Sequence, residues 1–251
     1  MHSERRRSII VWGPPGSGKS LYLSALVLWL PREREVAHLV ILPADSRSAA
    51  WLASRTRTDG GGILLDAARG ATPPNRFRIY STLAGLAAEQ RSAVVAELTA
   101  GDAVAGDPSL ADLESALGVL LLLPAAAMAA DSAVRDAHVR WLTTTLARLP
   151  ESAGAAPPAV SLPVAVCLTQ ADAVPDASRR DPTRWLESFG SEPIRALRAH
   201  CARFEIFKLS ALGQTPRHRD GLEVLASMPE PRDVLAPIRW ILDASLSQVA
   251  A

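Results

Sequence analysis

One eight-residue segment near the start of the chain constrains the fold more than any other feature: Gly13-Pro14-Pro15-Gly16-Ser17-Gly18-Lys19-Ser20. It has the spacing G-x-x-x-x-G-K-S, follows a short apolar stretch at residues 8–12, and precedes a helical pattern at residues 19–30. Glycines at these places let backbone N–H groups turn inward around an anion, and the start of a helix adds a favourable dipole. The sequence therefore predicts a strand, a phosphate-binding loop and a helix, in that order.

This loop predicts a site for a nucleoside triphosphate with Mg²⁺. Lys19 is expected to reach the β- and γ-phosphates, and the hydroxyl of Ser20 is expected to bind the metal ion. A fortuitous glycine turn is the alternative, and the agreement of motif, strand and helix argues against it. The predicted nucleotide contacts are consecutive in the chain: Gly13, Pro14, Pro15, Gly16, Ser17, Gly18, Lys19, Ser20 and Leu21.

Composition narrows the class of protein. The 251 residues are 48% apolar, which is enough for a sizeable core, and we expect a single domain over residues 1–251. A formal net charge of +1 gives no electrostatic footprint for nucleic acid, and the one basic run, at residues 5–7, is expected to be a solvated tail. The two cysteines, Cys167 and Cys201, are expected to be free and buried.

No segment has the pattern of a membrane span or a secretory leader. The longest apolar run, residues 116–130, is broken by Pro124 and falls short of the roughly 20 residues that a span needs. It is instead predicted to be a buried parallel strand that runs into a loop. The first thirty residues have no cleavage site after an apolar core, so we expect a cytoplasmic protein.

Strand and helix patterns alternate along the chain. Strands are predicted at residues 8–12, 76–82, 92–98, 117–123, 163–168 and 204–209, with a seventh at 36–42, and helices at 19–30, 132–149, within 181–203 and at 232–249. Residues 55–75 and 151–158 are rich in glycine or proline and are expected to be loops.

One short connection determines the predicted topology. About nine residues, 83–91, join the strand at 76–82 to the strand at 92–98, and a parallel crossover needs about a dozen or more. These two strands should therefore pair antiparallel, while the long helical connections elsewhere imply parallel neighbours. The expected fold class is α/β: a three-layer P-loop NTPase sandwich whose mostly parallel sheet of about six strands has one antiparallel strand, as in a Ras-like G domain.

Two further segments predict which base the site takes. Thr169-Gln170-Ala171-Asp172 follows the fifth predicted strand, and Ser210-Ala211-Leu212 follows the sixth, at the strand ends where open α/β sheets bind ligands. Guanine presents its N1–H and its N2 amine side by side, and the single carboxylate of Asp172 accepts both, whereas adenine offers no such donor pair. The N–H of Ala211 would meet guanine O6. Thr169–Asp172 resembles the [NT]-K-x-D motif of GTPases, in which the second residue is lysine. Gln170 stands at that position, and its stem is expected to lie across the base.

The segments that would sense the γ-phosphate are less regular. Leu98-Thr99-Ala100-Gly101 approximates D-x-x-G, with Gly101 placed to meet the γ-phosphate and Leu98 in the position of the metal-holding aspartate. Glu97 is one residue too early unless a bulge turns it. Asp102 follows, where it would either orient the attacking water or cap the next segment.

A switch threonine is expected between the first helix and the second strand. Thr72 is the best candidate to reach both Mg²⁺ and the γ-phosphate, with Thr56 and Thr58 as competitors. Lys19, Asp102 and Thr72 are thus the predicted catalytic residues, and Ser20 and Thr72 the predicted metal ligands. Three arginines lie in or near this segment: Arg55, Arg57 and Arg69. One of them could stabilise the transition state as an arginine finger, but each is more simply interpreted as a solvated surface residue.

These motifs together resemble those of small Ras-like GTPases of the prokaryotic double-GTPase type. The resemblance rests on residues 13–23, 70–74, 169–172 and 210–211 and on a late helix at 237–242, and so covers nearly the whole chain. It implies a GTP/GDP-dependent switch that acts on protein partners, with weak intrinsic hydrolysis because the D-x-x-G motif is broken.

Two other functions stay open at this stage. Leu98 favours a pseudo-GTPase scaffold that works by protein contact with little or no turnover. An ATPase or small-molecule kinase shares the phosphate loop and would need an arginine lid, for which residues 179–180 or 217–219 are candidates. Asp172 has no evident role in that third reading.

Overall fold

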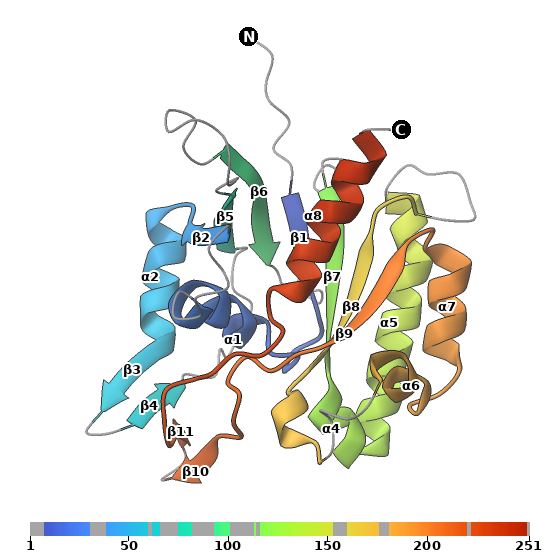
Figure 1. Ribbon diagram of the computed structural model, residues 1–251. Helices are drawn as coiled ribbons and strands as arrows, with labels where there is room; N and C mark the ends of the chain where they lie inside the picture. Colours follow the sequence, from blue (N-terminus) through green and yellow to red (C-terminus); the bar gives the residue numbers. More distant parts are fainter. Residues whose placement is uncertain are drawn as a thin grey trace.

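The structure is a computed structural model that describes residues 8–30, 39–59, 62–65, 75–81, 93–100, 113, 116–152, 160–175, 181–219 and 222–249. Seven strands form the main sheet (Figure 1). In spatial order they are β2 (Leu39–Pro43), β5 (Asn75–Ser81), β6 (Ala93–Ala100), β1 (Ser8–Trp12), β7 (Ala116–Pro124), β8 (Val164–Thr169) and β9 (Phe204–Lys208).

The strand pairing confirms the predicted topology. β5 runs antiparallel to both of its neighbours, β2 and β6, whereas β6, β1, β7, β8 and β9 pair in parallel. The seventh strand predicted at residues 36–42 is present as β2 and forms one edge of the sheet. The phosphate-loop strand β1 lies in the interior of the sheet, which agrees with its four buried apolar residues at 9–12.

Helices cover both faces and make three layers. One face carries α1 (Lys19–Ser24), which continues into a π-helical segment, η1 (Ala25–Trp29), and α8 (Ala236–Val249). The other carries α4 (Ala125–Ala130), α5 (Ser132–Ser152), α6 (Pro182–Glu187) and α7 (Glu192–His200). Strand β7 serves both layers, since Leu120 and Leu122 join the first core while Leu121 and Leu123 join the second.

A second, four-stranded sheet corrects the loop expected at residues 55–75. It consists of β10 (Arg217–Arg219), β11 (Leu222–Leu225), β4 (Gly62–Leu65) and β3 (Thr56–Asp59), in that order, and all of its pairings are antiparallel. It lies at the lower left of Figure 1, below α1 and α2 (Ser46–Arg55). Asp59 pairs antiparallel with Gly62, so β3 and β4 are the two strands of a hairpin rather than parts of a loop.

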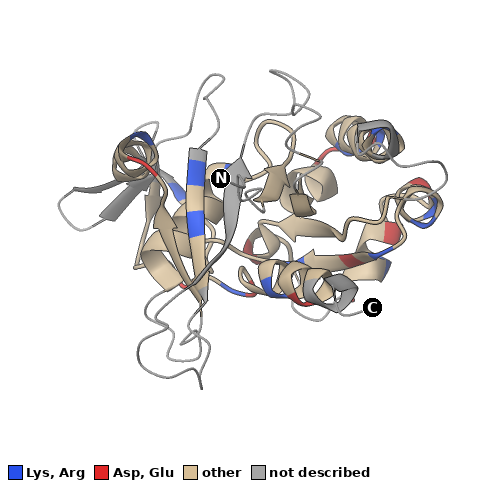
Figure 2. Cartoon of the chain, turned by 90° about the horizontal axis from the view of Figure 1, so that it is seen from above, with Lys and Arg blue, Asp and Glu red and all other residues tan. Residues whose placement is uncertain are grey.

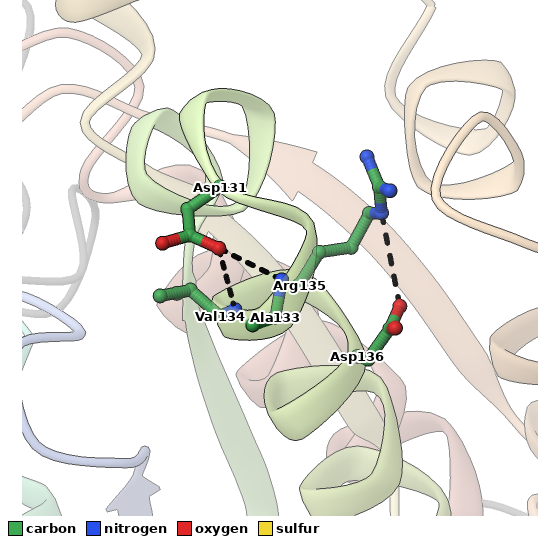
Figure 3. Close-up of polar contacts among 5 residues, drawn as sticks. All are labelled: Asp131, Ala133, Val134, Arg135 and Asp136. Carbon is green, nitrogen blue, oxygen red and sulfur yellow. Dashed lines mark hydrogen bonds and ion pairs between the residues drawn. The ribbon is translucent and has the colours of Figure 1, made fainter.

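Smaller differences concern element ends. Residues 125–130 form α4 rather than a loop, and α8 begins at Ala236 rather than at residue 232. Asp131 separates α4 from α5 and accepts hydrogen bonds from the N–H groups of Ala133 (2.7 Å) and Val134 (3.2 Å), as Figure 3 shows. Asp131 therefore caps the start of α5, so a second helix begins directly after α4.

Charge and hydropathy agree with the sequence analysis. No helix in the described part of the chain is long and apolar enough to cross a membrane. Lys and Arg residues are interspersed with Asp and Glu residues along the described segments rather than gathered in one place (Figure 2). Cys167 and Cys201 are both free and buried, as predicted, and burial raises the pKa of the Cys201 thiol to about 12.

Replacing Gly118 by alanine is expected to destabilise the protein. Gly118 lies on β7, and a Cβ atom there would be 2.7 Å from Cγ2 of Ile241 on α8 and 2.8 Å from the carbonyl oxygen of Pro163. Overpacking of this kind costs about 1–3 kcal/mol of unfolding free energy, measurable by denaturant titration. Ile241→Ala removes both Cγ atoms near this Cβ, so the double variant should lose less stability than the two single changes added together. Unchanged stability in Gly118→Ala would show that α8 does not lie this close to the sheet.

Candidate functional site

The segment between β1 and α1 forms a loop with the conformation needed for binding phosphate. Gly16 and Gly18 have left-handed φ angles of 78° and 84°, and a Cβ on Gly16 would meet nothing within 4 Å. The N–H of Ser17 donates to the carbonyl of Pro14 at 3.1 Å and closes the turn. Gly13 has no room for a side chain, since a Cβ there would lie 2.7 Å from the carbonyl oxygen of Leu122.

Lys19 lies at the first position of α1 and reaches back over this loop. Its Nζ donates to the carbonyl oxygens of Gly13 (2.6 Å) and Pro14 (3.0 Å). The amine is therefore held above the loop by hydrogen bonds to the loop's own backbone. A phosphate in the loop would meet this charge directly.

The segment predicted to recognise the nucleotide base, residues 169–172, is hydrogen-bonded to the phosphate loop. The hydroxyl of Thr169 lies within donor distance of the carbonyl oxygens of Ser17 (2.8 Å) and Leu123 (3.1 Å). Gln170 has a left-handed φ of 59°, and its Nε2 donates to the carbonyl of Gly16 at 3.2 Å. The amide of Gln170 thus contacts the phosphate loop itself, a contact that sequence reasoning did not anticipate.

Asp172 and Ser210, predicted from two distant motifs, are in direct contact. The hydroxyl of Ser210 donates a short hydrogen bond to Oδ1 of Asp172 and accepts one from the N–H of Gly213 at 2.7 Å. Asp172 lies on the 3₁₀ turn η3 (Ala171–Ala173), just after β8, and Ser210 follows β9. Their contact fixes one carboxylate oxygen of Asp172, and the group is only partly buried.

A third segment supports the loop after β9 and was missed by the sequence analysis. Ser210 and Arg232 exchange two backbone hydrogen bonds, and the N–H of Glu230 donates to the carbonyl of Leu212 at 2.9 Å. Gly213, with φ 71°, passes against the backbone of Glu230 where a Cβ would clash. The buried Pro229 and Pro231 were the available signal for an ordered segment here.

The remaining predicted residues divide into three groups. Leu21 and Ala211 are half-buried beside the site, and Pro15 is exposed at the tip of the phosphate loop. Leu212 is buried in the apolar core, so only its backbone faces the loop. The predicted residues Thr72, Gly101 and Asp102 lie outside the residues that the structure describes.

The register of β6 does not fit the D-x-x-G alignment at Leu98. Leu98 pairs with Ile9, four residues before Gly13, and is thus roughly 13 Å from the start of the phosphate loop at about 3.3 Å per residue. The register of β6 is regular from Glu97 to Ala100, so no bulge turns Glu97 to the other face; the irregularity in the β5–β6 pairing falls earlier, between Val94 and Ala96. The strand continues to Ala100, which pairs with Val11.

The structure also describes most of the alternative candidates for the switch threonine and for a kinase lid. The alternative switch threonines, Thr56 and Thr58, belong to the paired strand β3. Residues 217–219, considered as a kinase lid, form strand β10 of the second sheet, whereas residues 179–180 lie outside the described part of the chain. A lid is a segment that moves over bound phosphates, and a paired strand is not suited to that role.

The order and direction of the strands decide the fold class. One antiparallel strand lies next to β6, the phosphate-loop strand β1 is interior, and helices cover both faces. The fold is a Ras-like P-loop α/β sandwich. The edge strand β2 and the second sheet are additions to the six predicted strands.

Comparisons with known proteins add likenesses of structure. No protein-family model matches the chain, and no curated sequence matches it. A signal recognition particle receptor SRb-GTP/SRX complex from Chaetomium thermophilum matches with TM-score 0.45 and 19% identity over 84% of this chain and 93% of that chain. A small COPII coat GTPase SAR1 with GDP from Encephalitozoon cuniculi matches with TM-score 0.43 and 11% identity over 98% of this chain and 83% of that chain.

A third similar structure is a mutation variant of SsGBP, with TM-score 0.37 and 13% identity over 82% of this chain. This chain spans about half of that one, 51% of its length. Likenesses at these TM-scores do not establish a shared fold by themselves. The fold assignment therefore rests on the strand order and pairing.

Proposed function

We propose that the protein is a guanine-nucleotide-binding switch that takes GTP and GDP together with Mg²⁺. The contact between Asp172 and Ser210 carries this proposal. It places a fixed carboxylate at the edge of the sheet where the phosphate loop begins, and Thr169 and Gln170 tie the two parts of the site together.

The chemistry of this carboxylate favours guanine. One oxygen of Asp172 accepts from Ser210, which orients the group and leaves accepting capacity for the N1–H and N2 amine of the base. Adenine presents an acceptor at N1 and no amine at C2, so it cannot satisfy the carboxylate. A polar site of this kind discriminates strongly, because the wrong base leaves a desolvated charge unpaired.

The residues present also fit Mg²⁺. Ser20 follows Lys19 on the first turn of α1 and supplies the hydroxyl ligand, and we propose Thr72 as a second ligand. We further propose that Asp102, rather than position 98, provides the carboxylate that holds a metal-bound water, since Asp102 follows the end of β6 by two residues and Ala100 is paired with Val11 beside the loop. Mg²⁺ prefers such oxygen ligands and neutralises phosphate charge when it is bound.

Replacing Asp102 by asparagine tests the metal assignment. In the presence of Mg²⁺, affinity for GTP should fall roughly tenfold or more, because losing a residue that holds a metal-bound water weakens metal binding by about that factor. Affinity in EDTA, where no metal is bound, should stay the same. The matched control is Glu97→Gln, which removes a carboxylate from a mid-strand position. If Glu97→Gln and not Asp102→Asn changes the Mg²⁺ dependence, the assignment is wrong.

Turnover and partners form the finer part of the proposal. Intrinsic hydrolysis is slow and a protein partner stimulates it, because Asp102 stands where Ras-like enzymes have the glutamine that orients water. A single domain over residues 1–251 and a cytoplasmic location, both expected from the composition and pattern of the sequence, belong to the same proposal. The prokaryotic double-GTPase type rests on the sequence resemblance.

Titration of the purified protein with fluorescent GTP and ATP analogues, in Mg²⁺ and in EDTA, tests the function as a whole. We expect a Mg²⁺-sensitive preference for GTP. A preference for ATP would contradict the base-site argument and support the ATPase or kinase alternative. Binding of neither nucleotide would support a pseudo-GTPase scaffold.

A further inference from the structure

The side chain of Tyr22 connects the phosphate-loop helix to the far end of the chain. Tyr22 is on α1, two residues after Ser20, and its backbone N–H donates to the carbonyl of Gly18 at 2.8 Å. Its side chain is 0% exposed, and its hydroxyl donates to the carbonyl of Val234 at 2.9 Å, across 212 residues of sequence. A buried hydrogen bond thus joins the first turn of α1 to the segment before α8.

The hydroxyl of Tyr22 acts as a hydrogen-bond donor. Burial raises its pKa well above the ordinary value of a tyrosine, so it is protonated at neutral pH. Val234 is itself buried. Removing the hydroxyl of Tyr22 would therefore leave the carbonyl oxygen of a buried residue without this partner. Leaving a buried carbonyl unpaired costs free energy, so this hydrogen bond stabilises the position of the segment before α8.

From Val234 the contacts continue to the base site. Asp233 has a left-handed φ of 58°, which turns the chain sharply between Val234 and Arg232. The N–H of Arg232 donates to the carbonyl of Ser210 at 2.8 Å, and the N–H of Ser210 donates back at 3.1 Å. The hydroxyl of Ser210 then donates to Asp172.

We propose that Tyr22 is a positioning residue that sets the base-recognition pair Ser210–Asp172 relative to the phosphate loop, and thereby contributes to guanine specificity. This inference rests on the proposed function. Tyr22 touches neither the phosphates nor the base, and its effect passes through Val234 and Arg232 to Ser210. Removing its hydroxyl frees the supporting segment and leaves Lys19 and the phosphate loop in place.

The test is Tyr22→Phe, with binding of GTP, ATP and inorganic tripolyphosphate measured in Mg²⁺. We expect the ratio of GTP to ATP affinity to fall about 5- to 10-fold, in line with the loss of about one hydrogen bond, and tripolyphosphate affinity to change less than about twofold. The matched control is Ser245→Ala, which removes another hydroxyl that lies within donor distance of backbone carbonyl oxygens, those of Leu117 and Ile241. An unchanged ratio in Tyr22→Phe, or an equal fall in Ser245→Ala, would overturn the inference.

A double-mutant cycle separates positioning from general destabilisation. If Tyr22 acts through Ser210, the variant carrying both Tyr22→Phe and Ser210→Ala should lose no more discrimination than Ser210→Ala alone. Independent effects would multiply instead and would contradict the proposed route. Because both variants are measured as affinity ratios, a uniform loss of folded protein cancels.

A measurement on the unmodified chain covers the case in which Tyr22→Phe does not fold. Filling only the phosphate loop, with tripolyphosphate and Mg²⁺, should slow hydrogen exchange at the amides of Ser210, Arg232 and Gly213 as well as in the loop. Slowing confined to residues 13–20 would overturn the inference. A wild-type chain that shows no preference for GTP would contradict the proposed function itself, which the GTP and ATP titration reveals separately.

Discussion

Replacing Lys19 by alanine is expected to weaken GTP binding by on the order of 100-fold or more. Two charge-assisted hydrogen bonds to phosphate contribute about 1.5–3 kcal/mol each, and alanine supplies neither. The loop itself should keep its shape, since its left-handed residues are glycines and its closing bond joins Ser17 to Pro14 through the backbone. Fluorescence titration with a GTP analogue in Mg²⁺ measures the loss.

The control for this change is Arg239→Ala, which removes a positive charge from an exposed position on α8. It should bind nucleotide as the unmodified protein does. Thermal unfolding of both variants without nucleotide should agree with that of the wild type within a few degrees. Full GTP affinity in Lys19→Ala would show that the amine held over the loop has no part in binding phosphate.

Replacing Asp172 by asparagine is expected to lower GTP affinity by about two to three orders of magnitude, because a site built around base hydrogen bonds loses that much when the partners mismatch. The asparagine can still accept from Ser210 through its Oδ1, so the loop should be retained. Its NH₂ group, however, would face donors on guanine. Xanthine carries a carbonyl at C2 in place of the amine, so xanthosine triphosphate should bind the variant better than GTP does.

Competition of GTP, xanthosine triphosphate and ATP against one fluorescent probe measures this exchange of specificity. Asp136→Asn is the matched control, since the side chain of Asp136 is 71% exposed on α5 and pairs with Arg135 rather than with a residue of the proposed site. Equal GTP affinity in the Asp172→Asn variant and the wild type would remove the guanine assignment and leave only the phosphate loop.

The sequence by itself determined the elements whose signal is local. The phosphate loop is recognisable because glycine spacing, an apolar strand and a helix start lie within about twenty residues of one another. The antiparallel pairing of β5 and β6 was predictable because a short connection cannot make a parallel crossover, and that limit is geometric. That Thr169–Asp172 and Ser210 lie at the same edge of the sheet was predictable, because both segments follow parallel strands.

The four-stranded second sheet was decided by tertiary structure alone. Its strands come from residues 56–65 and 217–225, and neither hairpin has enough alternation to predict a strand without the other. A two-stranded hairpin is at best marginally stable in water, so each pair depends on pairing with the other through β4 and β11. Leu225 adds an anchor, since it is buried in the main core.

The register of β6 and the role of Tyr22 were likewise beyond the sequence. A D-x-x-G reading needs the strand to end near residue 98, and only the pairing of Leu98 with Ile9 shows that the strand runs on to Ala100. Tyr22 looks like an ordinary core residue of an amphipathic helix until Val234 is placed against it. In both cases the deciding contact joins residues that are far apart in the chain, and local sequence patterns do not predict such contacts.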